Sequence, residues 1–346
     1  MSAQCLRWIP LFCFSLSGFA QQSPAPDRRI TLDVVVTDKS GKPVSGLEQK
    51  DFTLLDNKQP QNILSFQAVN GAASADPPVE VILLSDEVNT NFTNVSVERA
   101  QVAKFLQHDG GELPRPVSIA FLSDSGIKIG SVTTRDGKAL VAQLDENKAG
   151  LRSITRDQGF YGAADRVGLS LHALEQLAAY ETPRPGRKLV IWISPGWPLL
   201  TGPREDLTSK DQQRIFGQIV AISDALRQAR ITLFSVDPLG TNDAGGFRTF
   251  YYEEFVKGVK KPSQVHIGNL ALQAIATQTG GRVLNSNNDV AGEIATCVAD
   301  ASAFYVLTFD GLPGDGPDEY HSLEVKLDRP GLKALTRTGY YAQPAR

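Results

Sequence analysis

The chain has 346 residues, of which 41% are hydrophobic and 21% are charged, which is ordinary for a folded globular protein and unlike a disordered one. Its length suggests two or three domains. The formal net charge of -3 at pH 7 provides no basic surface field, which argues against nucleic-acid binding.

The first 20 residues are typical of a secretory signal peptide. Arg7 supplies a positive charge, residues 8–19 are mostly apolar, and Gly18 and Ala20 are the small residues expected before a cleavage site. The apolar stretch is shorter than the ~20 residues that span a membrane. We therefore expect a cleaved signal, with a retained anchor as the alternative. The mature chain is predicted to be secreted or periplasmic and not membrane-spanning.

The cysteines leave no internal disulfide in the mature chain. Cys5 and Cys13 both lie in the signal peptide, so only Cys297 remains. Cys297 lies in an apolar helical pattern, and we expect it to be buried and inert.

A Pro-containing linker at 21–28 precedes a predicted all-β module at 29–70. Apolar and polar residues alternate along 30–37, which predicts a strand with one buried face. Turn sequences at 38–41 and 56–60 separate further short strands. Because so small a β module has little core of its own, we expect it to pack on the rest of the chain.

After a second linker at 71–78, the pattern from 79 to 303 alternates strands with helices. The predicted strands are 79–85, 117–123, 127–133, 187–194, 231–237 and 282–285. The predicted helices are 95–108, 136–146, 165–180, 211–229, 270–279 and 289–301. This alternation predicts an α/β domain with a doubly wound, mainly parallel sheet that helices cover on both faces.

The end of the chain, 304–346, returns to β structure. Segments 304–310, 320–328 and 333–342 are predicted strands joined by Gly, Pro and Asp turns. We expect this C-terminal extension to extend the sheet or to form a hairpin, with packing against the N-terminal module as one arrangement.

Polar residues follow several strands of the predicted sheet. Asp86 follows the strand 79–85, and Ser194 and Asp237 end two later strands. Thr155 lies in the loop before the helix at 165–180. In an open α/β sheet the ligand site lies beyond the carboxyl ends of the strands, and these hydroxyl and carboxylate oxygens suit Mg²⁺ or Ca²⁺.

These features together resemble a known family. A buried strand ends in Asp86 and is followed by Thr90, a helix and a strand pair, and then by PGRKLVIWIS at 185–194. This order resembles a von Willebrand factor type A (VWA) domain. With the flanking β segments and the closing RTGYYA at 337–342, the chain is similar over 29–342 to the acidobacterial family of secreted VWA-related proteins. The resemblance implies a fold rather than an activity.

The VWA resemblance also implies a metal-ion-dependent adhesion site, built on an Asp-x-Ser-x-Ser loop, a Thr and a second Asp. Asp86 matches the first Asp, while the two Ser positions fall on Val88 and Thr90. Asn89 could offer a carbonyl from a shifted position, and Thr155 stands for the Thr of the second loop. The resemblance therefore implies a degenerate site for Mg²⁺ or Ca²⁺ at Asp86, Asn89, Thr90 and Thr155.

The ligands that this chain lacks favour another interpretation. The third loop carries Pro195 where the family has an Asp, so a ligand is missing there. Asp86 or Asn89 would then bond backbone donors, and Thr90, Asn91 or Thr93 would cap the next helix.

A long loop, 240–268, is a second candidate for binding. Aromatic and basic residues on a long loop are typical of protein-binding surfaces, although the aromatics could instead cover the sheet edge. Trp197 follows the turn at Ser194 and is either an exposed contact or a core residue. The predicted partner contacts are Ser194, Trp197, Phe247, Arg248, Phe250, Tyr251 and Tyr252.

Motifs for catalysis and nucleotide binding are missing from the sequence. It has no Gly-x-Ser-x-Gly, GxGxxG or phosphate-binding Gly-Lys motif, and its four histidines are dispersed. We therefore expect a secreted, non-enzymatic, adhesion-type module that binds a protein or cell-envelope component, with no nucleotide. The alternatives are a hydrolase of envelope polymers with Asp86 or Asp237 as catalyst, and a purely structural envelope protein.

Overall fold

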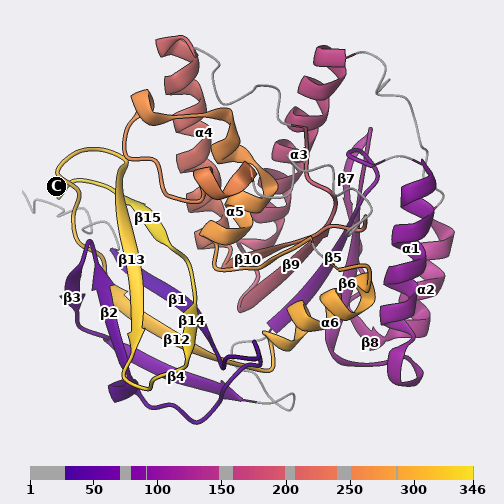
Figure 1. Ribbon diagram of the computed structural model, residues 1–346, viewed down its shortest axis with the longest axis horizontal. Helices are drawn as coiled ribbons and strands as arrows, with labels where there is room; N and C mark the ends of the chain where they lie inside the picture. Colours follow the sequence, from indigo (N-terminus) through magenta and orange to yellow (C-terminus); the bar gives the residue numbers. More distant parts are fainter. Residues whose placement is uncertain are drawn as a thin grey trace, which may run out of the picture.

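The computed structural model describes residues 28–70, 79–90, 92–147, 159–198, 207–239, 251–285 and 287–345. A mainly parallel sheet with helices on both sides stands beside two antiparallel sheets built from the two ends of the chain (Figure 1). The predicted signal peptide lies outside the described residues. None of the described helices is both long enough and apolar enough to cross a membrane.

The central sheet follows the predicted alternation of strands and helices. Its strands run in the order β11-β10-β9-β5-β6-β7, and β8 also pairs with β6. The strands from β11 to β6 are parallel, while β7 and β8 are antiparallel to β6. The bounds are β5 (Val79–Asp86), β6 (Glu112–Ser123), β7 (Gly126–Ile129), β8 (Thr134–Asp136), β9 (Arg187–Ile193), β10 (Ile231–Val236) and β11 (Val283–Leu284).

Helices cover both faces of the central sheet because successive strand residues point to opposite sides. Ile82 and Leu84 join one buried cluster, whereas Val81 and Leu83 join the other. The first cluster contains side chains of α3 (Gly159–Glu181), α4 (Ser209–Gln228) and α5 (Leu272–Gln278). The second contains side chains of α1 (Phe92–Leu106), α2 (Gly137–Glu146) and α6 (Val290–Ala299). Short 3-10 helices are η1 (Gln49–Asp51), η2 (His108–Gly111), η5 (Tyr251–Phe255), η6 (Pro262–Gln264) and η7 (Ile267–Leu270).

Helices α6 and α3 test two expectations from the sequence, the burial of Cys297 and the start of the helix predicted at 165. Cys297 is buried, as predicted, and burial raises the pKa of its thiol well above the usual value. Helix α3 begins at Gly159, six residues before the predicted start at 165. The early start was missed because the apolar periodicity that marks this helix begins only at Val167, the first residue of α3 in the buried cluster.

The two ends of the chain interleave in two four-stranded antiparallel sheets. Strand β12 lies between β1 and β4, and β13 lies between β15 and β2. The terminal β segments therefore pack against the N-terminal module, which was one of the predicted arrangements. The first sheet contains β14 (Lys333–Leu335), β1 (Arg29–Thr37), β12 (Ala303–Asp310) and β4 (Ser65–Asn70), and the second contains β15 (Gly339–Ala342), β13 (Glu319–Leu327), β2 (Phe52–Asp56) and β3 (Gln59–Gln61).

Strand β1 is buried on both faces, not on the one face that its alternation predicted. Leu32 and Val34 pack in the core between the two terminal sheets. On the opposite face, Val35 joins the cluster of α1, α2 and α6, and Asp33 forms an ion pair with Arg230. The sheet of β1 therefore lies between the second terminal sheet and the α/β domain.

Three arginines fasten the end of α6 where the chain enters β12. Arg187 Nη1 donates to the carbonyl of Asp300 at 2.9 Å, and Arg115 Nη2 donates to the carbonyl of Ala301 at 2.7 Å. Arg282 donates to both carboxylate oxygens of Asp300, each at 2.8 Å. The first two bonds pair backbone carbonyls just after the end of α6, and the Arg282 bonds pair a carboxylate. Together they join the α/β domain to the segment that enters the terminal sheets.

A buried polar cluster joins the N- and C-terminal strands of the second terminal sheet. Asp56 on β2 is 0% exposed, and its Oδ1 lies 3.0 Å from Nδ1 of His321 on β13. Asp56 Oδ2 accepts hydrogen bonds from the Tyr340 hydroxyl at 2.6 Å and from the Leu312 N–H at 3.2 Å. Burial and the adjacent Asp56 raise the pKa of Tyr340, which keeps this hydroxyl protonated as a donor.

We expect Asp56→Ala to destabilise the protein by about 2–4 kcal/mol, because it leaves buried donors of His321, Tyr340 and Leu312 unpaired. Urea unfolding measures the change. Asp315→Ala, at an exposed Asp in the turn before β13, is the control and should change stability by less than about 0.5 kcal/mol. Equal losses in the two variants would show that the cluster contributes little.

Candidate functional site

The carboxyl ends of three neighbouring strands meet at one edge of the central sheet. Ser85 on β5 pairs with Ile193 on β9, and Ile193 also pairs with Val236 on β10. The residues that follow these strands are therefore neighbours, as the sequence predicted. We call this edge the rim and define it as residues 86–90, 194–197 and 237–239.

Asp86 lies at the centre of the rim and is 0% exposed. Its Oδ1 accepts hydrogen bonds from the backbone N–H groups of Val88 and Asn89, both at 3.0 Å. Its Oδ2 accepts from Asn89 Nδ2 at 2.8 Å and from Trp192 Nε1 at 2.9 Å. Each oxygen thus has two donors, which fills the acceptor capacity of the carboxylate. The sequence interpretation in which Asp86 bonds backbone donors is confirmed.

Asn89 connects the rim to helix α3. Its Nδ2 also donates to Ser170 Oγ at 2.8 Å, and Ser170 Oγ donates to the carbonyl of Arg166 at 2.8 Å. Two rim oxygens, Asn89 Oδ1 and Thr90 Oγ1, are covered and have no hydrogen-bond partner.

The described residues do not fit a Mg²⁺ or Ca²⁺ ion at this position. A hard divalent cation takes six or more oxygens, and the oxygens of Asp86 already face four N–H donors. Val88 is packed in the core, and Pro195 has no side-chain ligand. Thr155 and Asn91 lie outside the described residues. Within the described ranges, no three His, Cys, Asp or Glu side chains are grouped to hold a metal ion.

Two more carboxyl groups lie next to Asp86. Ser85 points to the opposite face of β5 and donates to Glu98 Oε1 on α1 at 2.7 Å. Burial, reinforced by the charges of Asp86 and Glu87, raises the pKa of Glu98 well above its usual value, which favours the uncharged acid. Burial also raises the pKa of Glu87, and the ion pair with Arg99 at 2.5 Å opposes that shift. Acidic groups are therefore concentrated beneath the rim.

Ser194 and Trp197 do not form the predicted contact surface. Ser194 is 0% exposed, and its Oγ accepts a hydrogen bond from the Gly196 N–H at 3.1 Å. Trp197 is 5% exposed, packs edge-on against Trp192 and donates to the carbonyl of Leu270 at 2.8 Å. Because both side chains are used inside the protein, we remove them from the predicted partner-binding set.

The long loop 240–268 also differs from the expectation where it is described. Phe247, Arg248 and Phe250 lie outside the described residues, and so does the side chain of Tyr251. Tyr252 is half-buried, and burial, with the charge of Glu253, raises its pKa.

The later part of this loop packs against the fold. Phe255 stacks on His266 with ring centroids 4.6 Å apart, and the carbonyl of Val259 accepts a hydrogen bond from Tyr341 on β15 at 3.2 Å. From residue 255 onward, the segment therefore packs on α5 and the terminal strands.

Tyr161, which is 77% exposed in the first turn of α3, does not stand out in the sequence pattern. Helix α3 contacts the rim through Ser170 and continues for more than two helical turns beyond it, back to Tyr161. The only sign of an exposed contact residue in the sequence is that this tyrosine, in GFYGAA at 159–164, lies outside the apolar periodicity of the helix.

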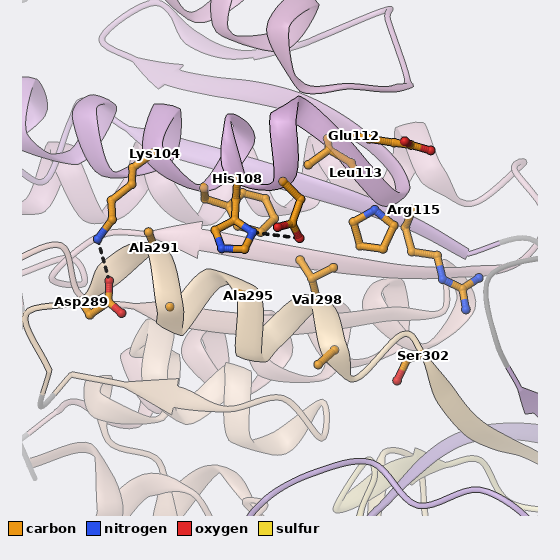
Figure 2. Close-up of a pocket in the computed structure, with 15 residues that line it drawn as sticks. Lys104, His108, Glu112, Leu113, Arg115, Asp289, Ala291, Ala295, Val298 and Ser302 are labelled. Carbon is orange, nitrogen blue, oxygen red and sulfur yellow. Dashed lines mark hydrogen bonds and ion pairs between the residues drawn. The ribbon is translucent and has the colours of Figure 1, made fainter.

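A groove of about 550 Å³ between α1 and α6 was also not predicted. Figure 2 shows Lys104 and Asp289 paired at one end of the groove, 3.1 Å apart, and Arg115 at the other end. The groove exists because α6 presents small side chains to α1. In the sequence, these small residues predict a helix but give no sign of a groove. Its apolar lining includes Phe105, Leu113, Ala291, Ala295 and Val298.

No known family model matches the chain, and no curated protein matches it. Among solved structures, the SpRpn10 VWA domain shares 10% identity over 62% of this chain and 94% of that chain, with a TM-score of 0.29. A single-residue mutant of the PilB minor pilin from Streptococcus sanguinis shares 11% identity over 78% of each chain, with a TM-score of 0.33. The pilus adhesin SpaC from Lactobacillus rhamnosus GG shares 10% over 87% of this chain and 49% of that chain, with a TM-score of 0.35. All three likenesses are remote.

Because N–H donors occupy Asp86, we expect cations to leave the melting temperature unchanged. With about 5 mM Mg²⁺, Ca²⁺ or Mn²⁺, the midpoint at pH 7 should stay within about 1 °C of its value in EDTA, since only a ligand that binds the native state raises it. If a cation raised the melting temperature by several degrees and Asp86→Ala abolished that increase, a cation would bind at Asp86 and this expectation would be wrong.

Proposed function

We propose that this chain is a secreted, non-enzymatic, VWA-like module that binds a protein or cell-envelope component at the rim, without needing a cation. The observation that carries the proposal is the register that sets the ends of β5, β9 and β10 side by side. In the central sheet, β6 lies on one side of β5, and the later strands β9, β10 and β11 lie on the other side. The strand order therefore reverses at β5, and α/β sheets bind ligands at such a switch point. A doubly wound VWA-like arrangement is part of this proposal.

The rim has the rigidity that a recognition surface requires. Four hydrogen bonds hold Asp86, and the Asn89–Ser170 bond fixes α3 relative to β5. Fixed groups lose little conformational entropy on binding. Tyr161 extends from this frame as an exposed aromatic, the residue type that binding hot spots favour.

The hydrolase alternative is less well supported. A carboxylate catalyst needs an oxygen that reaches its substrate. Asp86 is fully buried and fully hydrogen-bonded, which leaves no oxygen for such a role. Asp237 lies at the end of β10, where its Oδ1 accepts the N–H of Leu239 at 2.9 Å.

Two tyrosines on α3 provide a matched test. Tyr161 lies at the rim end of the helix, and Tyr180 lies at the other end, where Lys188 donates to the carbonyl of Glu181. A photo-reactive amino acid at 161 in the intact protein, incubated with envelope extract, would identify a partner. The affinity of the purified partner is then measured for the wild type, Tyr161→Ala and Tyr180→Ala.

We expect Tyr161→Ala to weaken binding about tenfold or more, because it removes an exposed aromatic side chain at the rim end of α3. Tyr180→Ala should change the affinity by less than about twofold, since its ring lies under the guanidinium of Arg184, away from the rim. Equal effects of the two variants would exclude the rim as the binding surface. Failure to cross-link any partner would favour the structural-protein alternative.

A further inference from the structure

Glu293, in the first turn of α6, is a buried residue whose carboxyl Oε2 has no hydrogen-bond partner among the described residues. The residue is 7% exposed, and its Oε2 is covered by protein and accepts no hydrogen bond in the structure. The side chain is not among the residues that line the groove between α1 and α6. A buried carboxylate normally has a cation or several donors near it, so an unsatisfied one requires an explanation.

Among the described residues, the charges that act on Glu293 are acidic. Asp237 ends β10, against which α6 packs, and Asp289 immediately precedes α6. Burial, followed by the charges of Asp237 and Asp289, raises the pKa of Glu293 from its usual 4.5 to about 7. No basic side chain contributes to this shift.

The charged side chains on the other elements that pack on α6 form ion pairs or hydrogen bonds with groups other than Glu293. On α1, Lys104 pairs with Asp289, Arg99 pairs with Glu87, and Glu98 accepts the Ser85 hydroxyl. On β9, Arg187 donates to the carbonyl of Asp300 at the opposite end of α6. On α6 itself, the thiol of Cys297 lies one turn after Glu293, and burial keeps it protonated. Because none of the described residues on these elements supplies Glu293 with a cation, we infer that a proton neutralises it.

We propose that Glu293 and Asp237 form a pH-sensitive pair that holds the first turn of α6 against the end of β10 while Glu293 is protonated. Loss of the proton places two negative charges next to each other in a buried site. The first turn of α6 then loosens from β10, and the rim beside Asp237 becomes less stable. This inference concerns stability and is independent of whether a partner binds at the rim.

The direction of the pH effect follows from the raised pKa. Below about pH 4.5 both folded and unfolded chains carry the proton, so the pair has no effect. Between about pH 4.5 and 7 the folded chain holds a proton that the unfolded chain has released, so stability falls as the pH rises. Above about pH 7 the destabilisation is complete.

The test compares unfolding of the wild type and Glu293→Gln in urea between pH 5 and pH 8. Glutamine keeps the shape of the side chain and removes its charge. Between these pH values, the unfolding equilibrium constant of the wild type should rise roughly 10- to 100-fold more than that of Glu293→Gln. Glu146→Gln, at the exposed end of α2, is the matched control and should retain the wild-type pH profile.

Two further measurements localise the effect. Asp237→Asn should shift the pH-dependent loss to lower pH, because it removes the charge that disfavours ionised Glu293. Hydrogen exchange at pH 8 should be faster in residues 291–295 of the wild type than in Glu293→Gln, and equal at pH 5 after correction for intrinsic rates.

Identical pH profiles of the wild type and Glu293→Gln would overturn the proposal. Faster exchange spread evenly over the whole protein would also contradict it, because the predicted loosening is local to α6. If Ca²⁺ stabilises the wild type at pH 8 and not Glu293→Gln, the pair binds a cation, and the proton-based proposal is wrong.

Discussion

The hydrogen bonds to the carboxylate of Asp86 are the constraint on which the rim depends. A buried carboxylate is costly unless donors surround it. Backbone N–H groups of Val88 and Asn89, the Asn89 amide and the Trp192 indole supply four donors from two segments of the chain. Asp86 thereby joins the end of β5 to β9 and, through Asn89 and Ser170, to α3. These N–H groups fix the position of the carboxylate at the rim.

The rest of the molecule stabilises this frame from the opposite edge of the sheet. Arg115, Arg187 and Arg282 bind the last residues of α6, directly before the chain enters β12. Strand β12 then lies between β1 and β4, so the C-terminal part of the chain closes the sheet that the N-terminal part begins. Helix α6, which lines the groove with α1, is thereby anchored to the central sheet and to the terminal sheets.

Much of the fold could be predicted because it depends on local periodicity. Alternating strands and helices, and polar residues after β5, β9 and β10, are visible in the sequence and meet at one rim. The sequence left open whether Trp197 is exposed or buried, because its burial depends on Trp192 in β9 and on Leu270, which is distant in the sequence. Interleaving of β12 with β1, the groove beside Ala295, and the raised pKa of Glu293 likewise arise from contacts between distant segments.

The central claim is that N–H donors, and the Trp192 indole in particular, compensate the charge of Asp86. A double-mutant cycle of Asp86→Ala and Trp192→Phe, measured by urea unfolding, tests it most directly. The two side chains should show a coupling free energy of about 1–3 kcal/mol, as expected for a buried hydrogen bond to a charged group. Losses that add within about 0.3 kcal/mol would show that Trp192 does not stabilise the carboxylate, and would contradict the account.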